Sequence, residues 1–137
     1  MGVRYIVSDG GRVVIEKWVG EISHTELMNH EKEQLNDQSI ADEAIVIVDA
    51  RQAAFPEATL DGAREFAILL AAPNKRAKFS HFALLVTGET WEQAKVLESE
   101  TKKLGKEIIT FNDLNTACTW LGLDAKKVLK ALESIVI

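Results

Sequence analysis

The polar side chains best placed to bind a ligand follow two predicted buried strands. These strands are the β-branched and aliphatic runs Ala44 to Val48 and His81 to Val86. Where parallel strands end, their carboxyl ends share one rim with the N-termini of the following helices, whose free amides attract anions. The residues that the spacing places at this rim are Asp49, Arg51, Thr59, Asp61, Thr87, Gly88, Thr90 and Trp91.

Two interpretations of this rim are open. In the first, the backbone amides near Gly88 to Thr90 hold a small acid or phosphate group, and Arg51 supplies a planar fork of donors. In the second, Asp49 and Arg51 pair with each other, and the threonines cap helices without any ligand. Open α/β sheets host many unrelated functions, so the rim by itself does not name one.

Glu31 is the carboxylate closest to an apolar helix face. It lies four residues after Leu27, three after Met28 and four before Leu35 in a helix predicted from Ser23 to about Asp37. Burial there would raise the pKa of Glu31, as in many general acids and bases. Because the apolar stripe is short, we expect a peripheral helix with Glu31 solvated at its edge. No partner for proton transfer to Glu31 can be identified, so we expect no catalytic residue.

The same helix carries histidines and acids that suggest a metal site. His24, Glu26, His30, Glu31 and Glu33 are all ordinary metal ligands. The two histidines are six positions apart, which does not place them on one helix face, and the His-Glu-x-x-His pattern is absent. We therefore expect a solvated helix of mixed charge, with no metal and no cofactor.

Composition narrows the class of protein further. The chain has 137 residues and a formal net charge of −5, which opposes the broad basic surface of nucleic-acid binders. Cys118 is its single cysteine, so no internal disulfide forms, and a reducing compartment such as the cytoplasm is expected. No segment has the roughly 20 apolar residues of a membrane span. We expect one domain over residues 1–137.

Along the chain, segments with the hydrophobic pattern of strands alternate with segments that have the pattern of helices. A hairpin is predicted over Val3 to Ser8 and Arg12 to Val19, around Asp9-Gly10-Gly11. A loop is expected over Arg51 to Ala58, and helices follow from about Thr59 to Ala72, where Pro73 stops the helix, and from Thr90 to Leu104. A short strand from Ile108 to Phe111 precedes two further helices. Strands joined by helical crossovers form a mainly parallel sheet, so the predicted fold class is α/β.

This order of elements resembles the SpoIIAA-like, or STAS, family, which is named for anti-sigma factor antagonists and the cytoplasmic tails of sulfate transporters. The resemblance covers residues 3–122 and leaves 123–137 as a helical extension. It rests on Val19-Gly20-Glu21-Ile22-Ser23, on Ile45-Val46-Ile47-Val48-Asp49, and on the phrase from Phe111 to Gly122. It implies a mixed, mainly parallel sheet with an N-terminal β-hairpin and about five helices.

One departure from the family concerns its phosphorylation switch. Antagonists of that type carry an Asp-Ser-Ser-Gly-like phrase at the start of the helix after the central strand. This chain has Ala58-Thr59-Leu60-Asp61-Gly62 there, so Thr59 is the nearest hydroxyl. The chain is therefore more similar to the uncharacterised SpoIIAA-like branch than to the sigma-regulating one.

The resemblance favours a non-catalytic regulatory or binding domain that meets a protein partner or a small anionic or apolar ligand. The alternative is a carrier or sensor of a lipid-like molecule, as in the SEC14-related branch, which needs an apolar pocket of several hundred cubic ångströms. A third, weaker alternative is a small hydrolase or isomerase that uses Asp49, Arg51 or Glu31.

The helix that follows Thr59 also predicts self-association. Its second half, Phe66 to Ala72, is apolar on nearly every side, whereas a helix on one face of a sheet keeps a polar outer face. We expect a homodimer whose interface includes Phe66, Ile68 and Leu69.

Ile68→Asp should convert this dimer into a monomer, because a charge would be buried at the contact. Light scattering at micromolar protein gives the mass of each form. A monomer mass for the unchanged protein, or a dimer mass that survives the substitution, contradicts the hypothesis.

Overall fold

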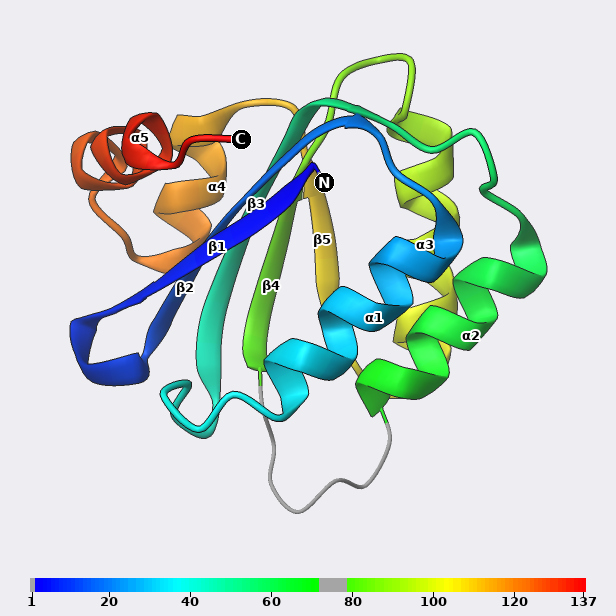
Figure 1. Cartoon of the computed structure of the whole chain (residues 1–137), viewed down its shortest axis with the longest axis horizontal. Helices are drawn as coiled ribbons and strands as arrows, with labels where there is room; N and C mark the ends of the chain where they lie inside the picture. Colours follow the sequence, from blue (N-terminus) through cyan, green and yellow to red (C-terminus); the bar gives the residue numbers. More distant parts are fainter. Residues whose placement is uncertain (1, 72–78) are drawn as a thin grey trace.

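The computed structural model describes residues 2–71 and 79–137 as one sheet with helices on both faces (Figure 1). The sheet has five strands in the order β1-β2-β3-β4-β5. The elements in chain order are β1 (Val3–Ser8), a short 3₁₀ turn (Asp9–Gly11), β2 (Val13–Glu21), α1 (His24–Leu35), β3 (Ala44–Ala54), α2 (Leu60–Ala71), β4 (Phe79–Leu85), α3 (Trp91–Lys103), β5 (Ile108–Phe111), α4 (Leu114–Leu121) and α5 (Ala125–Ser134).

The sheet is mainly parallel, as predicted. Strands β1 and β2 pair antiparallel as a hairpin, and β2, β3, β4 and β5 pair parallel with their neighbours. Residues that are far apart in sequence therefore meet at one rim. The predicted end of α2 at Ala72 and Pro73 lies outside the described residues.

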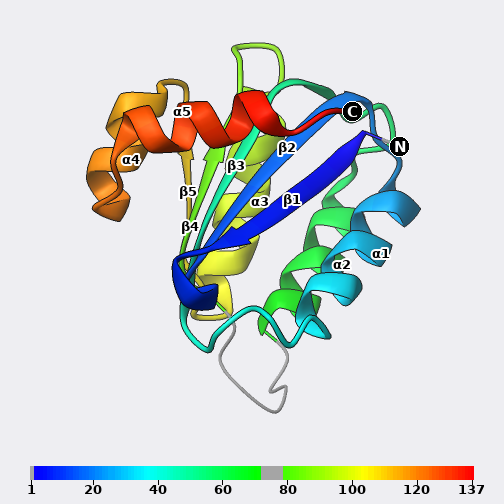
Figure 2. The ribbon, with the colours of Figure 1, turned by 60° about the vertical axis from the view of Figure 1, so that its left-hand side comes forward.

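Helices α1, α2 and α3 cover one face of the sheet, and α4 and α5 cover the other (Figures 1 and 2). Two hydrophobic clusters follow from this arrangement. Val14, Val46 and Leu84 point toward α1 to α3, whereas Ile15 and Ile47 point toward α4 and α5. Successive strand residues face opposite sides, so both faces of the central strands are apolar, as is usual in covered parallel sheets.

The hairpin turn is wider than a two-residue turn. Asp9, Gly10 and Gly11 all have positive φ, and Gly11 is buried against the segment after α1. A Cβ atom on Gly11 would lie 2.4 Å from the Ser39 carbonyl oxygen. Glycine is therefore required at position 11 by both its conformation and its surroundings.

Strand β3 is longer than the sequence predicts, and the loop predicted over Arg51 to Ala58 is wrong in its first half. The strand continues to Ala54, where Ala53 pairs with Gly20 and Ala54 with Glu21. A register shift between Lys17 and Val19 of β2 admits one extra residue of β3. A bulge of this kind lets pairing continue through a polar stretch that has no strand-like pattern.

The capping box predicted at Ser23 forms only in part. The Ser23 hydroxyl accepts a hydrogen bond from the Glu26 backbone N–H at 3.1 Å. The Glu26 carboxylate instead accepts from the backbone N–H of Gly2, also at 3.1 Å. The start of α1 is thus tied to the edge of β1 rather than closed on itself.

The described helices include none that is long and apolar enough to cross a membrane.

Ile47→Ala should lower the free energy of unfolding by about 2–5 kcal/mol, because the side chain is completely buried in the central strand and its loss leaves a cavity. Val136→Ala, at a position 81% exposed, should change it by less than about 0.5 kcal/mol. Urea unfolding compares the two. Equal losses of unfolding free energy in the two variants would contradict the burial of β3 between two helical layers.

Candidate functional site

The rim residues are divided between the two faces of the sheet. Arg51 forms a bidentate ion pair with Asp49, with Nε to Oδ1 at 2.9 Å and a terminal nitrogen to Oδ2 at 3.0 Å. This pairing outweighs the effect of burial and raises the pKa of Arg51. Hydrogen bonds from Thr116 lower the pKa of Asp113, which caps α4, and the charge of Arg51 lowers it further. The pair thus belongs to the α4 side, away from Thr59.

The other rim residues act mainly in local structure. The Thr59 hydroxyl accepts from the Gly62 backbone N–H at 3.0 Å, so it caps the start of α2. Thr90 is buried beside the first turn of α3, and Trp91 lies under the ammonium group of Lys95 at 5.7 Å. Asp61, Thr87 and Gly88 are exposed. The capping and pairing interpretation describes Thr59 and the Asp49–Arg51 pair. It is wrong for Thr90, whose hydroxyl makes no capping hydrogen bond and donates to the Thr87 carbonyl oxygen at 3.4 Å. Ligand binding at the rim stays a prediction.

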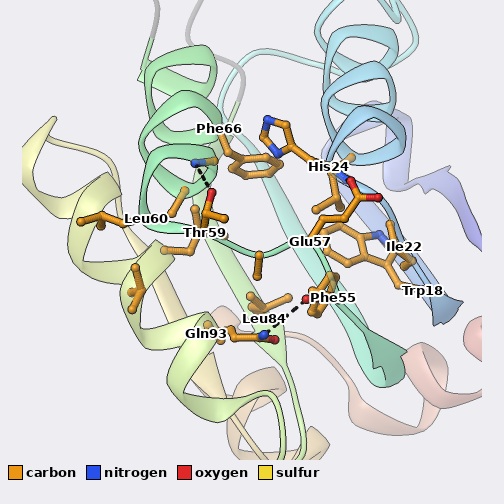
Figure 3. A pocket seen from close by; sticks show the side chains of 17 residues that line it. Trp18, Ile22, His24, Phe55, Glu57, Thr59, Leu60, Phe66, Leu84 and Gln93 are labelled. Atoms are coloured by element: carbon orange, nitrogen blue, oxygen red, sulfur yellow. Dashed lines mark hydrogen bonds between the residues drawn. The ribbon is translucent and has the colours of Figure 1, made fainter.

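An apolar pocket of about 360 Å³ opens between the sheet and helices α1, α2 and α3 (Figure 3). Of the rim residues predicted from sequence, Thr59 lines it. The walls come from the end of β2, the segment after β3, and facing sides of the three helices, with Leu84 of β4 beneath. Its large apolar side chains are Trp18, Ile22, Leu27, Phe55, Leu60, Phe66, Leu84, Val96 and Leu97.

Some polar groups of the lining form hydrogen bonds with each other, whereas His24 Nε2 is buried without a hydrogen-bond partner among the described residues. Gln93 Nε2 donates to the Phe55 carbonyl oxygen at 3.3 Å. The Glu57 carboxylate accepts from the His24 backbone N–H at 3.2 Å, and the His24 imidazole lies 3.5 Å from a Glu65 oxygen. The two ionisable side chains of the lining therefore do not face each other as an acid and a base.

Sequence reasoning missed this pocket. Its apolar residues have the strand or helix spacing of ordinary core positions. Nothing in the sequence of a single strand or helix indicates that these side chains line a pocket. An apolar Phe55 in a predicted loop was the available sign, because loops are usually polar.

A second group of functional side chains is a buried polar cluster between β2 and α1. The Glu16 carboxylate of β2 is completely buried, and its Oε1 accepts from Trp18 Nε1 at 3.0 Å and from His30 Nε2 at 2.7 Å. Glu31 is also completely buried. The prediction that Glu31 is solvated at a helix edge is therefore wrong.

The physical reason is the rotation of α1 about its own axis. The buried residues of this helix are polar: His30, Glu31 and Gln34. The apolar residues Leu27 and Met28 are only partly buried against the core. Because β2 presents Glu16 toward α1, the helix turns its His30 side inward, and an apolar stripe does not reveal that orientation.

Aromatic rings hold His30 in place and connect the cluster to the pocket. Tyr5 and Trp18 meet the imidazole edge to face, with centroids 5.5 Å and 6.1 Å away. Trp18 also packs edge to face on Phe55 at 6.0 Å, inside the pocket lining. One indole thus forms a wall of the pocket and a hydrogen bond of the cluster.

The cluster shifts the protonation of both acid and imidazole. Burial and, after it, the nearby charge of Glu16 raise the pKa of Glu31 to about 8, although the charge of His30 acts in the opposite direction. For His30, burial lowers the pKa, but the hydrogen bond and charge of Glu16 outweigh it, so the net pKa is raised. Close to neutral pH Glu31 therefore stays protonated.

The remaining candidates have structural surroundings. Cys118 is buried, which raises the pKa of its thiol and suppresses reactivity. His81 is exposed at the start of β4 and meets Trp120 edge to face at 5.1 Å.

Of the predicted interface residues, Phe66 is only 3% exposed and lines the pocket, Leu69 is half-buried, and Ile68 is 61% exposed. Phe66 is thus occupied within the monomer, and self-association stays a prediction.

The architecture is similar to that of a solved structure. No family model matches the chain, and no curated protein matches it. The chain is similar to an uncharacterized protein of the DUF3478 family, with a SpoIIAA-like fold, from Shewanella loihica PV-4. The TM-score is 0.55 and the identity 19%, with 88% of this chain and 94% of that chain covered. The predicted SpoIIAA-like α/β fold is confirmed.

The protonation of Glu31 predicts a stability that falls with rising pH in chelator-treated protein. The folded pKa lies above the ordinary value of 4.5, so the folded state holds the additional proton between about pH 4.5 and 8. Stability must then fall through this window, by at most about 1.4 kcal/mol per pH unit for one proton. The raised pKa of His30 acts with the same sign.

Glu31→Gln should flatten this dependence and stabilise the protein at pH 8, because glutamine resembles the neutral acid. Glu33→Gln, at an exposed position of the same helix, should leave it unchanged. Urea unfolding at several pH values is the measurement. A profile in which the two variants coincide would show that Glu31 ionises normally.

Proposed function

We propose that this SpoIIAA-like fold is a non-catalytic binding domain that takes an apolar small molecule into the pocket between the sheet and α1, α2 and α3. The supporting observation is the volume and lining of that pocket. About 360 Å³ falls within the range of small-molecule sites, which are mostly apolar with a few placed polar groups.

The lining favours a lipid-like ligand over an anionic one. Trp18, Phe55 and Phe66 present large apolar surfaces, whereas Gln93 and Thr59 already use their polar atoms in local hydrogen bonds. An apolar ligand leaves these bonds intact and removes hydrophobic surface from water. Arg51, the cation expected to hold an anion, is paired with Asp49 instead.

The two ionisable side chains of the lining support binding rather than catalysis. Glu57 interacts with the backbone of His24, and the imidazole is directed to Glu65. General acid–base catalysis needs a proton donor or acceptor within hydrogen-bond reach of the reacting group. Here these groups serve to orient the polar end of a ligand at the mouth of the pocket.

Protein binding through α2 is the second candidate. Leu60 is 47% exposed and Ile68 61% exposed, eight positions apart and so close to one face of the helix. Large apolar side chains on an outer helix face are typical of interfaces. In this proposal a homodimer forms through Ile68, which is not part of the pocket lining, whereas Leu60 borders the pocket at the start of the same helix.

The neutral apolar fluorophore N-phenyl-1-naphthylamine should bind the purified protein saturably, with energy transfer from the tryptophans, of which Trp18 lies in the pocket wall. Ala63→Phe should weaken binding at least about tenfold, which corresponds to about 1.4 kcal/mol, because Ala63 lines the pocket and a ring there fills it. Fluorescence titration is the measurement.

Ser99→Phe is the matched control, since it adds the same ring at an exposed position of α3 outside the lining. It should bind the probe like the unchanged protein. The proposal fails if the probe does not saturate, or if Ala63→Phe and Ser99→Phe bind it equally well.

A further inference from the structure

The Glu16–His30–Glu31 cluster combines the donors of a metal site in a buried place. Each of the three residues offers one ligand atom, and these atoms all lie within 4.8 Å of one another. Glu16 and Glu31 are completely buried, and His30 is 7% exposed. They come from two elements, β2 and α1, so no sequence motif announces them.

The polar atoms of this cluster are incompletely satisfied within the described residues. Glu16 Oε2 and both carboxylate oxygens of Glu31 are buried there without a hydrogen-bond partner. The amide oxygen and nitrogen of Gln34, one helical turn beyond His30, have none either. Buried polar groups are nearly always paired, so each unpaired one indicates a missing water, proton or ion.

We propose that Glu16, His30 and Glu31 bind one divalent transition-metal ion between β2 and α1. The ion would contact oxygens that otherwise lack a partner, and it would neutralise two buried carboxylates beside a neutral imidazole. None of these three residues lines the apolar pocket, so the ion and the pocket ligand would be held by different side chains.

The donor set selects the class of ion. One imidazole and two carboxylates suit zinc, manganese or iron, whereas a thiolate site is impossible here because Cys118 lies on the other face of the sheet. The Trp18 indole N–H, 3.0 Å from Glu16 Oε1, would hold that carboxylate in place as an outer partner. The edge contacts of Tyr5 and Trp18 would fix the imidazole plane.

The competing arrangement uses protons instead of a metal. In it Glu31 is neutral, and the His30–Glu16 hydrogen bond carries the charge. The two arrangements differ in a measurable way, because metal binding requires both carboxylates to lose their protons. A metal-binding protein is stabilised by the ion, whereas a proton-sharing cluster does not respond to it.

The three side chains are shielded from solvent, so the ion must enter as the chain folds or as α1 opens. The full chain is therefore expressed in medium supplemented with zinc or with manganese and purified without chelator. Metal content is measured by plasma mass spectrometry, and thermal unfolding is recorded before and after treatment with EDTA.

We expect about one ion per chain in the unchanged protein and a lower melting temperature after EDTA. Glu31→Gln should lose the ion and the effect of EDTA. It should still fold, because glutamine resembles a protonated glutamate, and circular dichroism checks this. Glu33→Gln, exposed on the same helix, should keep the ion and the EDTA effect.

Three results would overturn the proposal: substoichiometric metal in the unchanged protein, metal that persists in Glu31→Gln, or a melting temperature indifferent to EDTA. Persistence in Glu31→Gln would indicate surface binding at exposed histidines such as His81. Indifference together with a folded, metal-free Glu31→Gln would support the proton-sharing arrangement.

Discussion

The burial of the Glu16 carboxylate on strand β2 constrains much of the rest of the structure. A charge without solvent must be met by hydrogen bonds or opposite charge, and here Trp18 and His30 supply them at 3.0 Å and 2.7 Å. Because His30 belongs to α1, this requirement sets the rotation of that helix. The same rotation brings Glu31 and Gln34 into the interior, where an apolar face would otherwise pack. A polar interaction thus specifies a contact that hydrophobic patterning alone leaves open.

The cluster and the pocket share a boundary at Trp18. Its N–H group donates to Glu16, and its ring lines the pocket and packs on Phe55. A change in the charge of the cluster would therefore act on a side chain that a pocket ligand contacts. Both sites lie on the face covered by α1, α2 and α3. The opposite face, with α4 and α5, is packed around Ile47, Ala83 and Leu85 and contains the Asp49–Arg51 pair. The sheet thus separates a structural face from the face that offers both candidate sites.

Prediction from sequence succeeded where the signal is local. The glycine-rich hairpin turn and the alternating strands and helices each arise from neighbouring residues. The extension of β3 to Ala54 was missed, because that part of the strand depends on a bulge and on pairing with β2. The parallel strands from which the rim was inferred are present, but the predicted rim residues were assigned to one crevice. Asp49 instead follows Ile47 on the α4 side of the sheet, whereas Thr59 lines the pocket on the side of α1, α2 and α3.

The α/β class, the order of elements and the resemblance to SpoIIAA-like proteins can be inferred from the sequence, because they follow from periodicity and capping within short segments. Which side chains become neighbours depends on how the layers pack. Glu16 and His30 are fourteen positions apart and belong to a strand and a helix whose relative rotation no single segment encodes. The pocket likewise arises because three helices do not fill the space above Leu84. The burial of a side chain depends on how the sheet and helices pack against each other, and this packing makes Glu31 part of a buried cluster instead of a solvated acid.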